Sequence, residues 1–208
     1  MSIGLRPGLH WCDHTWPLDA IHSKHSAARA EHKSLFSGVF AVLIMQRAFA
    51  GTPEAIGFND ATRYFDQVLQ NLPRGVLFVA RVFPDDQSLL PPNQDSRLIG
   101  VVALALQEDT RQPIPTLPPP AEDAYLSNMA VDAKFRRLGV GKLLLALCDE
   151  AAKVAGKDSI SLHVRQGDNP ANQLYLSYGY MEQARDNFIA AKLKQVRPRS
   201  LMRRTLKR

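Results

Sequence analysis

The chain is predicted to fold as an α/β domain with a mixed central sheet of about six or seven strands flanked by helices. Its 208 residues are 45% hydrophobic and 22% charged, a composition typical of a folded protein with one buried core. Short apolar runs of strand length recur along the second half of the chain, and amphipathic runs of helix length lie between some of them. Because strands and helices do not alternate regularly, a mixed sheet is expected rather than an all-parallel one.

The first part of the chain is expected to be mainly helical. Residues 1–20 are interpreted as an irregular arm, and residues 21–208 as a single domain. From Leu18 to Ala50 the composition favours helix, with Gly38 as a candidate break. A second amphipathic helix is predicted over Asn59–Leu72, with Asn59 as its N-cap, because an asparagine side chain can accept a hydrogen bond from an unpaired amide of the first turn.

The rest of the chain is predicted to contain further strands and two helices. The predicted strands are Val76–Phe83, Leu98–Leu106, Ala124–Val131, Ser159–Arg165, Tyr180–Asn187 and Ser200–Leu206. The first two are expected to form an antiparallel hairpin with the polar loop Pro84–Asp95 at its tip, and the proline-rich loop Gln112–Pro120 precedes the third. A long helix begins near Val140 and ends at Gly156, and a short one covers about Pro170–Tyr178.

The loop before the long helix is predicted to bind phosphate. Its sequence FRRLGVGK places Arg136, Arg137 and Lys142 around Gly139 and Gly141. Glycines let the backbone approach an anion closely. The first amides of a helix have no internal acceptor, and the helix dipole adds partial positive charge at the same point. Arginine and lysine side chains add full charges to this site.

Two common phosphate loops do not fit this sequence. A Walker-type loop is excluded because Arg136 stands where its first glycine should be, and Leu143 where its hydroxyl should be. A dinucleotide fingerprint would need glycine at the position of Leu144. In the helix itself, the predicted apolar face consists of Val140, Leu143, Leu144, Leu147, Ala151 and Val154. Cys148 is expected on or near the buried side as a reduced thiol.

With the strand YLSNMAV before it, the R-x-x-G-x-G loop resembles the GNAT superfamily of N-acetyltransferases. A second motif of that family lies in NPANQLYLSYGY, where Ala171, Leu174, Tyr175, Gly179 and Tyr180 match. The good match to the family pattern covers about residues 124–182, and the sequence there is most similar to cyanobacterial and plastid members. The resemblance implies the acyl-CoA N-acyltransferase fold. It also implies an enzyme that transfers acetyl directly from acetyl-CoA to a primary amine, without a covalent enzyme intermediate.

The resemblance also assigns residues to the cofactor. Those it implies are Met129, Ala130, Val131, Arg136, Arg137, Leu138, Gly139, Val140, Gly141, Lys142, Asp168, Asn169, Pro170 and Asn172. The loop would hold the pyrophosphate, and the strand Asn128–Val131 would pair with the pantetheine arm. Asp168 stands where the family often has asparagine, so which of Asp168, Asn169 and Asn172 orients that arm is open. We favour Asp168 and Asn169 together, with Asp168 also capping the short helix.

Tyr175 is the expected general acid. A phenol with a pKa of about 10 is protonated at neutral pH, so it can donate to a departing thiolate whose conjugate acid has a pKa of about 8.5. Tyr178 is interpreted as structural. On the other side of the reaction, Ser127 and Tyr125 are candidates to face the acceptor amine. Glu122 is a candidate general base, although a surface carboxylate is the simpler interpretation.

The chemistry of the amine separates acceptor classes. Neutralising a lysine side chain at pH 7 costs roughly 4–5 kcal/mol, whereas an α-amino group costs only about 1 kcal/mol. Protein N-termini and small amines are therefore chemically easier acceptors than lysine, and the resemblance to plastid members keeps lysine in play. The predicted acceptor is a protein N-terminal α-amine, a lysine or both. The alternatives are an enzyme for small amines such as polyamines, arylalkylamines or drugs, and a non-catalytic protein that senses CoA or docks on RNA.

The charge is unevenly placed. The net charge is +6, and no acidic residue follows Asp186. The cations after it are Lys192, Lys194, Arg197, Arg199, Arg203, Arg204, Lys207 and Arg208. This basic C-terminal part is interpreted either as a contact for an anionic partner or as a solvated strand and tail that raises the local potential.

No metal, membrane span or secretory signal is expected. His10, Cys12 and His14 could present metal ligands, but no fourth ligand stands at metal spacing, so a polar arm is the preferred interpretation. The longest apolar run is far shorter than the roughly 20 residues of a membrane span. Cytoplasm or plastid stroma is the expected location. The sequence does not assign an oligomeric state or show whether a transit peptide was removed.

Overall fold

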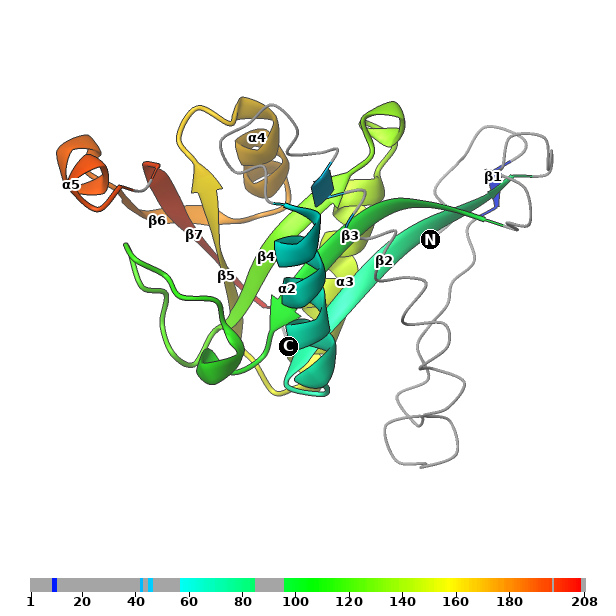
Figure 1. Ribbon diagram of the computed structural model, residues 1–208, viewed down its shortest axis with the longest axis horizontal. Coiled ribbons are helices and arrows are strands. Elements are labelled where there is room, and N and C mark those ends of the chain that lie inside the picture. The colour runs from blue at the N-terminus through cyan, green and yellow to red at the C-terminus, as the bar shows by residue number, and fades with distance from the viewer. Residues whose placement is uncertain are drawn as a thin grey trace.

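The computed structural model describes residues 57–84, 96–195 and 197–206, together with residues 9, 10, 42, 45 and 46. They form one mixed seven-stranded sheet with the strand order β1-β2-β3-β4-β5-β7-β6 (Figure 1). The strands are β1 (Leu9–His10), β2 (Gly75–Pro84), β3 (Arg97–Ala105), β4 (Ala124–Val131), β5 (Ser159–Arg165), β6 (Met181–Arg185) and β7 (Arg199–Thr205). The helices are α2 (Phe58–Gln70), α3 (Val140–Val154), α4 (Asn169–Ser177) and α5 (Phe188–Leu193), with short 3-10 turns η3 (Glu108–Thr110) and η4 (Ala133–Phe135).

The sheet is antiparallel except at its centre. β2 pairs with β3 and β3 with β4 in antiparallel register, as the predicted hairpin requires. β4 and β5 are parallel, and β7 is antiparallel to both β5 and β6. The α/β class, the mixed sheet and the predicted strands are therefore confirmed, apart from shifts at strand ends.

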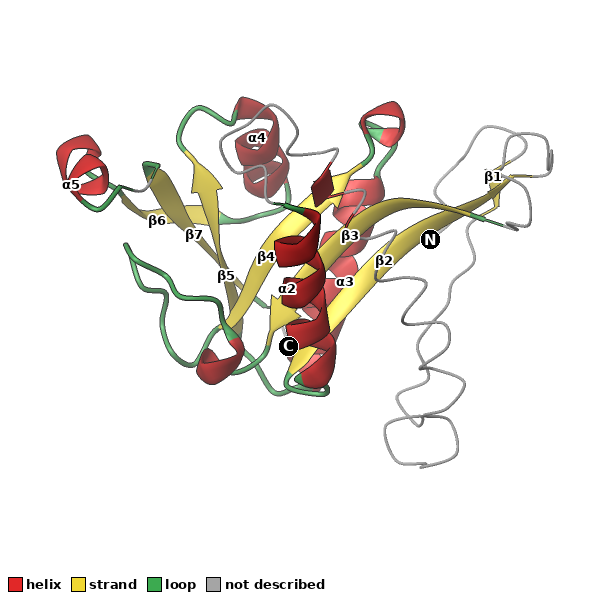
Figure 2. Ribbon diagram, in the orientation of Figure 1, coloured by secondary structure: helices red, strands yellow, loops and turns green. Residues whose placement is uncertain are grey.

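Helices cover both faces of the sheet (Figure 2). On one face lies α2, whose buried residues Ala61, Tyr64, Phe65 and Val68 recur at helical spacing and pack with Val101 and Ala103 of β3. On the other face α3 and α4 pack in a second cluster that contains Leu144, Leu162 and Tyr175. Neighbouring residues of β3 therefore face two separate layers, with Val102 and Leu104 in the second cluster.

Two local predictions are wrong. The N-cap of α2 is Gly57, and Asn59 lies exposed inside the first turn, because the helix begins one residue earlier than expected. The buried face of α3 is Val140, Leu144, Leu145, Cys148, Asp149 and Ala152. Leu143 and Leu147 lie half-buried on its flank, and Val154 is 60% exposed. The observed buried stripe is rotated relative to the predicted one because Asp149 is buried against a partner on β7. The sequence pattern could not show that contact.

Helix α5 was not predicted. Its Phe188, Ile189 and Leu193 are 70%, 70% and 80% exposed, and Ala191 is its buried residue. The large apolar side chains of this helix point to solvent, so its sequence lacks the buried apolar stripe by which an amphipathic helix is predicted. Of the predicted helix over residues 18–50, residues 42, 45 and 46 are described, and they are helical. The loop tip and the side chains of His10, Cys12 and His14 lie outside the described residues.

Candidate active site

The centre of the site is the point where β4 and β5 separate. These parallel strands pair at three positions only, from Ala124↔Ile160 to Leu126↔Leu162. Beyond Leu126, β4 continues to pair with β3 but no longer with β5, and β5 continues with β7. A bulge opposite β3 accompanies the separation, with Asn128 at a φ of 52°. Within the described residues, the edge of β4 that includes Met129, Ala130 and Val131 is therefore not paired with β5, and its pairing with a pantetheine arm stays a prediction.

The predicted phosphate loop lies at the end of this edge. The first backbone bond of α3 runs from the Leu143 amide to the Gly139 carbonyl at 3.0 Å, so the amides of residues 140–142 have no acceptor within the helix. Arg137 and Gly139 both have left-handed backbone conformations, with φ of 64° and 88°. Such alternation can turn successive amides toward one anion.

The two loop glycines have different reasons to be glycine. Gly139 needs its positive φ, and a Cβ there would meet nothing within 4 Å. A Cβ on Gly141 would lie 2.9 Å from Cδ2 of Leu174 and 3.4 Å from Cε of Met129. The start of α3 is therefore packed closely between β4 and α4, which brings both halves of the predicted motif together.

The loop side chains are turned to solvent. Arg136, Arg137, Leu138 and Lys142 are exposed. The Arg136 Nε donates to the Val131 carbonyl at 3.2 Å, which fixes this guanidinium beside the end of β4. Within the described part of the chain, no carboxylate forms an ion pair with these cations. Their charge is available to a phosphate group.

Asp168 caps α4, as predicted. Its carboxylate accepts from the Ala171 amide at 3.2 Å and from Arg165 at 3.1 Å. The following Asn169 and Pro170 are exposed in the first turn, and Asn172 is half-buried. Because Asp168 is committed to the cap and to Arg165, the amides Asn169 and Asn172 are the freer side chains for a bound arm.

Tyr175 lies on the α4 side of the strand separation. Its side chain is 7% exposed and meets Tyr180 edge-to-face, with 5.7 Å between ring centroids. Burial raises the pKa of its phenol, and the negative charge of Asp168 raises it further. The phenol therefore stays protonated throughout the physiological range, and within the described part of the chain its hydroxyl makes no hydrogen bond. Tyr178, by contrast, donates to Asp149 at 3.0 Å and has a structural place.

On the α2 side, a hydrogen-bonded set faces the same point. The Tyr125 hydroxyl lies 2.9 Å from Nδ1 of His163, and Nε2 of His163 lies 3.0 Å from the Leu117 carbonyl. Because a carbonyl only accepts, Nε2 carries the proton, and Tyr125 donates to Nδ1. The Tyr64 and Ser127 hydroxyls lie 2.9 Å apart beside this pair.

Both members of the pair have shifted ionisation. Burial, assisted by the charge of Arg199, lowers the pKa of His163 to about 4. Burial raises the pKa of Tyr125 to about 12. At neutral pH both are uncharged, so the pair is a neutral donor–acceptor chain. His163 was missed from the sequence; the only available signal was a polar residue inside the apolar strand SISLHVR. Glu122, the candidate base, is exposed outside this set.

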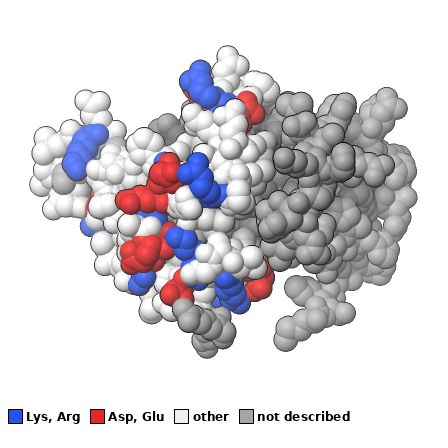
Figure 3. All heavy atoms as spheres, turned by 90° about the horizontal axis from the view of Figure 1, so that it is seen from below, with Lys and Arg blue, Asp and Glu red and all other residues white. Residues whose placement is uncertain are grey.

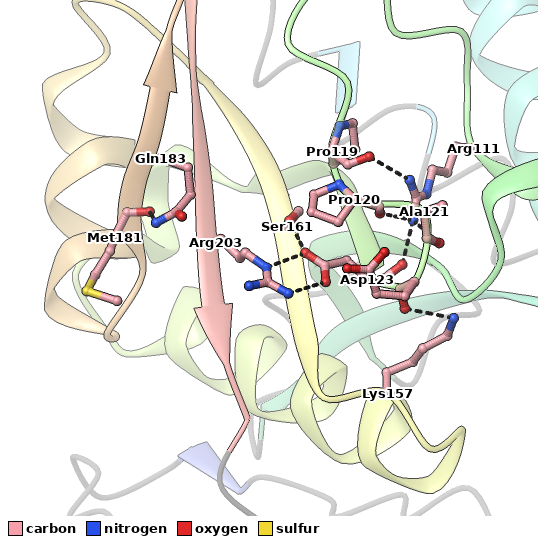
Figure 4. A network of polar contacts seen from close by, with 11 residues as sticks. Arg111, Pro119, Pro120, Ala121, Asp123, Lys157, Ser161, Met181, Gln183 and Arg203 are labelled. Carbon is pink, nitrogen blue, oxygen red and sulfur yellow. Dashed lines mark hydrogen bonds and ion pairs between the residues drawn. The ribbon is translucent and has the colours of Figure 1, made fainter.

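Two arginines of the basic C-terminal part pair with buried carboxylates, whereas Lys192, Lys194 and Arg197 are exposed. Two hydrogen bonds of 2.7 and 2.8 Å join Arg203 to Asp123, which is 1% exposed, and Arg204 pairs with buried Asp149 (Figure 4 shows the first of these). These arginines neutralise buried carboxylates rather than form a free basic strand. On the face seen in Figure 3, lysines and arginines are interspersed with acidic residues. Lys207 and Arg208 lie outside the described residues.

Neither a candidate membrane span nor a candidate metal cluster occurs within the described ranges. No helix in them is long and apolar enough to cross a membrane. No group of three or more His, Cys, Asp or Glu side chains in them is placed to hold a metal ion. Cys148 is buried and unpaired, as expected.

Comparison with known proteins agrees with this geometry. The model of the Acetyltransferase (GNAT) family matches residues 56–180, more than half of the chain. "GCN5-related N-acetyltransferase 5, chloroplastic" of Arabidopsis thaliana is 29% identical over 115 residues, which are 54% of this chain and 36% of that protein. The chain thus spans about a third of the length of this curated relative.

Two solved structures show the same fold. The ribosomal-protein-S18-alanine N-acetyltransferase from Escherichia coli is 18% identical with a TM-score of 0.55, over 83% of this chain and 90% of that one. The acetyltransferase yncA from Salmonella typhimurium, solved with its cofactor acetyl-CoA, is 12% identical with a TM-score of 0.53, also over 83% and 90%. The predicted acyl-CoA N-acyltransferase fold is confirmed.

Proposed function

Because the chain belongs to the GNAT family of acetyltransferases, we propose that it transfers acetyl from acetyl-CoA to the α-amino group of a protein or peptide. The observation that carries this proposal is the separation of β4 and β5, with Tyr175 on one side of it and the Tyr125–His163 pair on the other. A thioester entering along β4 would meet a protonated phenol on one side and a neutral hydrogen-bond acceptor on the other.

The residues divide the reaction between them. The amine nitrogen attacks the thioester carbonyl carbon, the carbon–sulfur bond breaks, and the proton that the amine loses passes to solvent water, from which Tyr175 regains the proton that it gives to the sulfur. In our assignment Tyr175 donates a hydrogen bond, and then a proton, to the departing sulfur. Backbone amides on the edge of β4 that is not paired with β5 would stabilise the oxyanion. The amides of residues 140–142 and the side chains of Arg136, Arg137 and Lys142 would hold the pyrophosphate.

The acceptor side favours an amine that is already neutral. A group with a pKa of about 4, such as His163, is a weak base. It lies roughly 6 pKa units below a lysine ammonium, a gap of about 8–9 kcal/mol, whereas an α-amino group with a pKa of about 7.8 is partly neutral at pH 7. In this assignment the phenol oxygen of Tyr125 accepts a hydrogen bond from the incoming amine while its hydroxyl donates to His163. That arrangement orients an α-amine without having to deprotonate it fully.

The described residues give no support to a polyamine acceptor. The carboxylates near the acceptor side, Asp123 and Asp186, are occupied by Arg203 and by the Arg199 amide. A polycation would also face the guanidinium groups of Arg111 and Arg199. Lysine side chains remain a second acceptor class, because other parts of a partner could desolvate them.

The test combines binding with product mapping. Calorimetry with acetyl-CoA should show binding. Thioester consumption should then be followed with peptides that carry a free α-amine and an internal lysine, and with the same peptides blocked at the N-terminus. We expect α-acetylation of the free peptides and little transfer to the blocked ones, with products located by mass spectrometry. Acetyl on lysine alone would overturn the α-amine assignment, transfer only to spermidine would favour a small-amine enzyme, and binding without turnover would indicate a CoA sensor.

The cellular site belongs to the proposal as well. The Arabidopsis relative is named as chloroplastic, which supports a plastid or cyanobacterial setting for this chain. Fractionation of the source cells with an antibody against the chain would test it.

A further inference from the structure

The link between β3 and β4 is far longer than its geometry requires. Antiparallel neighbours can be joined by a two-residue turn, yet these strands are joined by residues 106–123, here called the β3–β4 loop. Figure 1 shows this loop extending past β4 to lie beside β5 and β7. A loop that reaches β5 and β7 does more than join β3 to β4.

The loop is fastened at its end near β4 and in the middle. At its end near β4, the Arg111 guanidinium donates to the carbonyls of Pro120 and Ala121 at 2.9 Å each, and to that of Asp123 at 2.6 Å. In the middle, the Thr116 hydroxyl is buried, 3.1 Å from the Asp186 carboxylate and 3.0 Å from Arg199.

A third contact comes from the link between β6 and β7. There Lys194 donates to the Pro115 carbonyl at 3.0 Å. With the Thr116 contacts it ties the loop to the far side of the sheet. The loop is therefore held in one conformation by elements distant in the sequence.

This anchoring places one residue in a strained conformation next to the site. Leu117 has a φ of 51°, a conformation that few residues other than glycine adopt. Its carbonyl is the group that accepts from Nε2 of His163 at 3.0 Å. Strain of this kind persists only where surrounding contacts impose it, and here those contacts are the ones on either side of Leu117.

We propose that the β3–β4 loop is a positioning element for acetyl transfer, in which the Leu117 carbonyl fixes the proton of His163 on Nε2 and so keeps Nδ1 as the acceptor for Tyr125. This inference rests on the proposed function. The hydrogen bond made by one imidazole nitrogen determines which tautomer is present. If the proton moved to Nδ1, Tyr125 would have to accept from the imidazole instead of donating to it. Its hydroxyl proton would then turn away from the ring, and one of its two oxygen lone pairs would no longer be available to an amine.

The groups that face the imidazole come from several elements. Arg199 of β7 lowers the pKa of His163, and Asp186 beside β7 raises it. From β4 comes the phenol of Tyr125, and the loop itself contributes the Leu117 carbonyl. Burial remains the largest cause of the lowered pKa. Displacing the loop would expose the ring and shift its pKa upward, toward the ordinary value of about 6.5.

A pair of substitutions at one position separates the backbone effect from the side-chain effect. Leu117→Gly removes the side chain but favours a positive φ, whereas Leu117→Val keeps an apolar side chain and strongly disfavours that φ. Nitrogen chemical shifts of the imidazole, measured by NMR, report the tautomer independently of any activity. We expect Leu117→Gly to retain the Nε2–H form and Leu117→Val to populate the Nδ1–H form.

The kinetic consequence should follow the tautomer. In Leu117→Val we expect kcat to fall about tenfold, because the wrong tautomer cannot accept the hydrogen bond that holds Tyr125. The KM for acetyl-CoA should stay unchanged. The acid limb of the pH–rate profile should move upward, because exposing the ring raises the pKa of His163. Thr116→Val, which removes the hydroxyl contacts without changing Leu117, should act in the same direction. Circular dichroism would verify that each variant is folded.

The outcomes decide between the possibilities. A tautomer unchanged in both Leu117→Val and Thr116→Val, or changed equally in Leu117→Gly, would overturn the proposal. So would a changed tautomer with unchanged kcat. Failure of the proposed function is recognised separately, because the wild-type protein would then bind no acetyl-CoA or transfer no acetyl before any variant is compared.

Discussion

The two sides of the strand separation are built by contacts of different range. On the cofactor side, hydrogen bonds that shape the loop and α4 join residues close in sequence: Lys134 to Asp132, Arg136 to Val131 and Ala171 to Asp168 are two, five and three positions apart. On the acceptor side, Tyr125 and His163 are 38 positions apart, Thr116 and Asp186 70, and Arg203 and Asp123 80.

This difference has a structural consequence. The cofactor side is a short strand–loop–helix unit whose shape follows from its own glycines and caps. The acceptor side exists only after the sheet has formed, because β7, β5 and the β3–β4 loop must meet before its hydrogen bonds can close. We therefore expect changes on the two sides to affect different properties, and the predictions below test that separation.

The largest effect is expected at Tyr175. Tyr175→Phe removes the hydroxyl that would donate to the leaving thiolate, so kcat should fall by about 100-fold or more while the Kd for acetyl-CoA stays nearly unchanged. The matched control is Tyr178→Phe, which removes the hydrogen bond to Asp149 and should cost about 1 kcal/mol of stability without lowering kcat. Steady-state kinetics and calorimetry on both variants provide the measurement; a wild-type rate in Tyr175→Phe would remove this residue from the mechanism.

The next effect concerns the stability of the acceptor side. Asp123→Asn breaks a buried bidentate pair with Arg203 and should lower the free energy of unfolding by about 3 kcal/mol. The exposed pair of Asp60 and Arg63 supplies the control, because Asp60→Asn should cost about 0.5 kcal/mol or less. Acetyl-CoA affinity should be retained in both, if the two sides are built independently.

The pH dependence of this pair has a definite sign. Burial alone would raise the pKa of Asp123, but hydrogen bonds from Arg203 and Ser161 outweigh it and lower the pKa below its usual value. A lowered folded pKa means that the stabilisation is fully present above the unfolded value of about 3.9 and is lost as the pH falls through the folded value. The difference between wild type and Asp123→Asn in urea unfolding should shrink below about pH 4; a constant difference would contradict this assignment.

The same division explains what could be predicted from the sequence. Gly139 and Gly141 could be singled out from local spacing alone, whereas the roles expected for Asp168 and Tyr175 came from the resemblance to the GNAT family. The strands were identifiable because apolar runs report burial on both faces of a sheet. His163 and the role of the β3–β4 loop were not, since no spacing along the chain reveals that a carbonyl 46 positions away will meet an imidazole.

Errors in the helices have the same origin. Asp149 looked like a surface residue of α3 until β7 supplied Arg204 as its partner, and this shifted the buried stripe of the helix. The basic C-terminal part was interpreted either as a contact for an anionic partner or as a solvated strand and tail, and neither interpretation anticipated that Arg203 and Arg204 pair with buried carboxylates. Composition reports how many charges a segment has, but not whether a buried carboxylate will face them.

A smaller effect is expected at the loop glycine. Gly139→Val forces a β-branched residue into a φ of 88°, which should cost roughly 2 kcal/mol or displace the loop, and acetyl-CoA affinity should fall about tenfold or more. Gly156→Val is a close control, because Gly156 has a φ of 71°, also has open space around its Cα, and ends the same helix. Both variants should lose similar stability in thermal unfolding, and only Gly139→Val should lose affinity. Equal affinity loss in both would mean that the loop has no special part in binding.

The smallest effect should distinguish the two sides by pH alone. Between about pH 6.5 and pH 4 the unfolded chain binds a proton at His163 that the folded protein does not, so this residue stabilises the fold above pH 6.5 and loses that contribution as the pH falls to 4. Because the ring is partly exposed, solvent screening limits the effect to about 1–2 kcal/mol. Urea unfolding at pH 7.5 and pH 4.5 should show a weaker pH dependence in His163→Gln than in wild type. Tyr175 stays protonated across this range. The change in acetyl-CoA affinity between pH 7.5 and pH 4.5 should therefore be the same in wild type and in His163→Gln. A different change in the variant would show that the two sides are coupled.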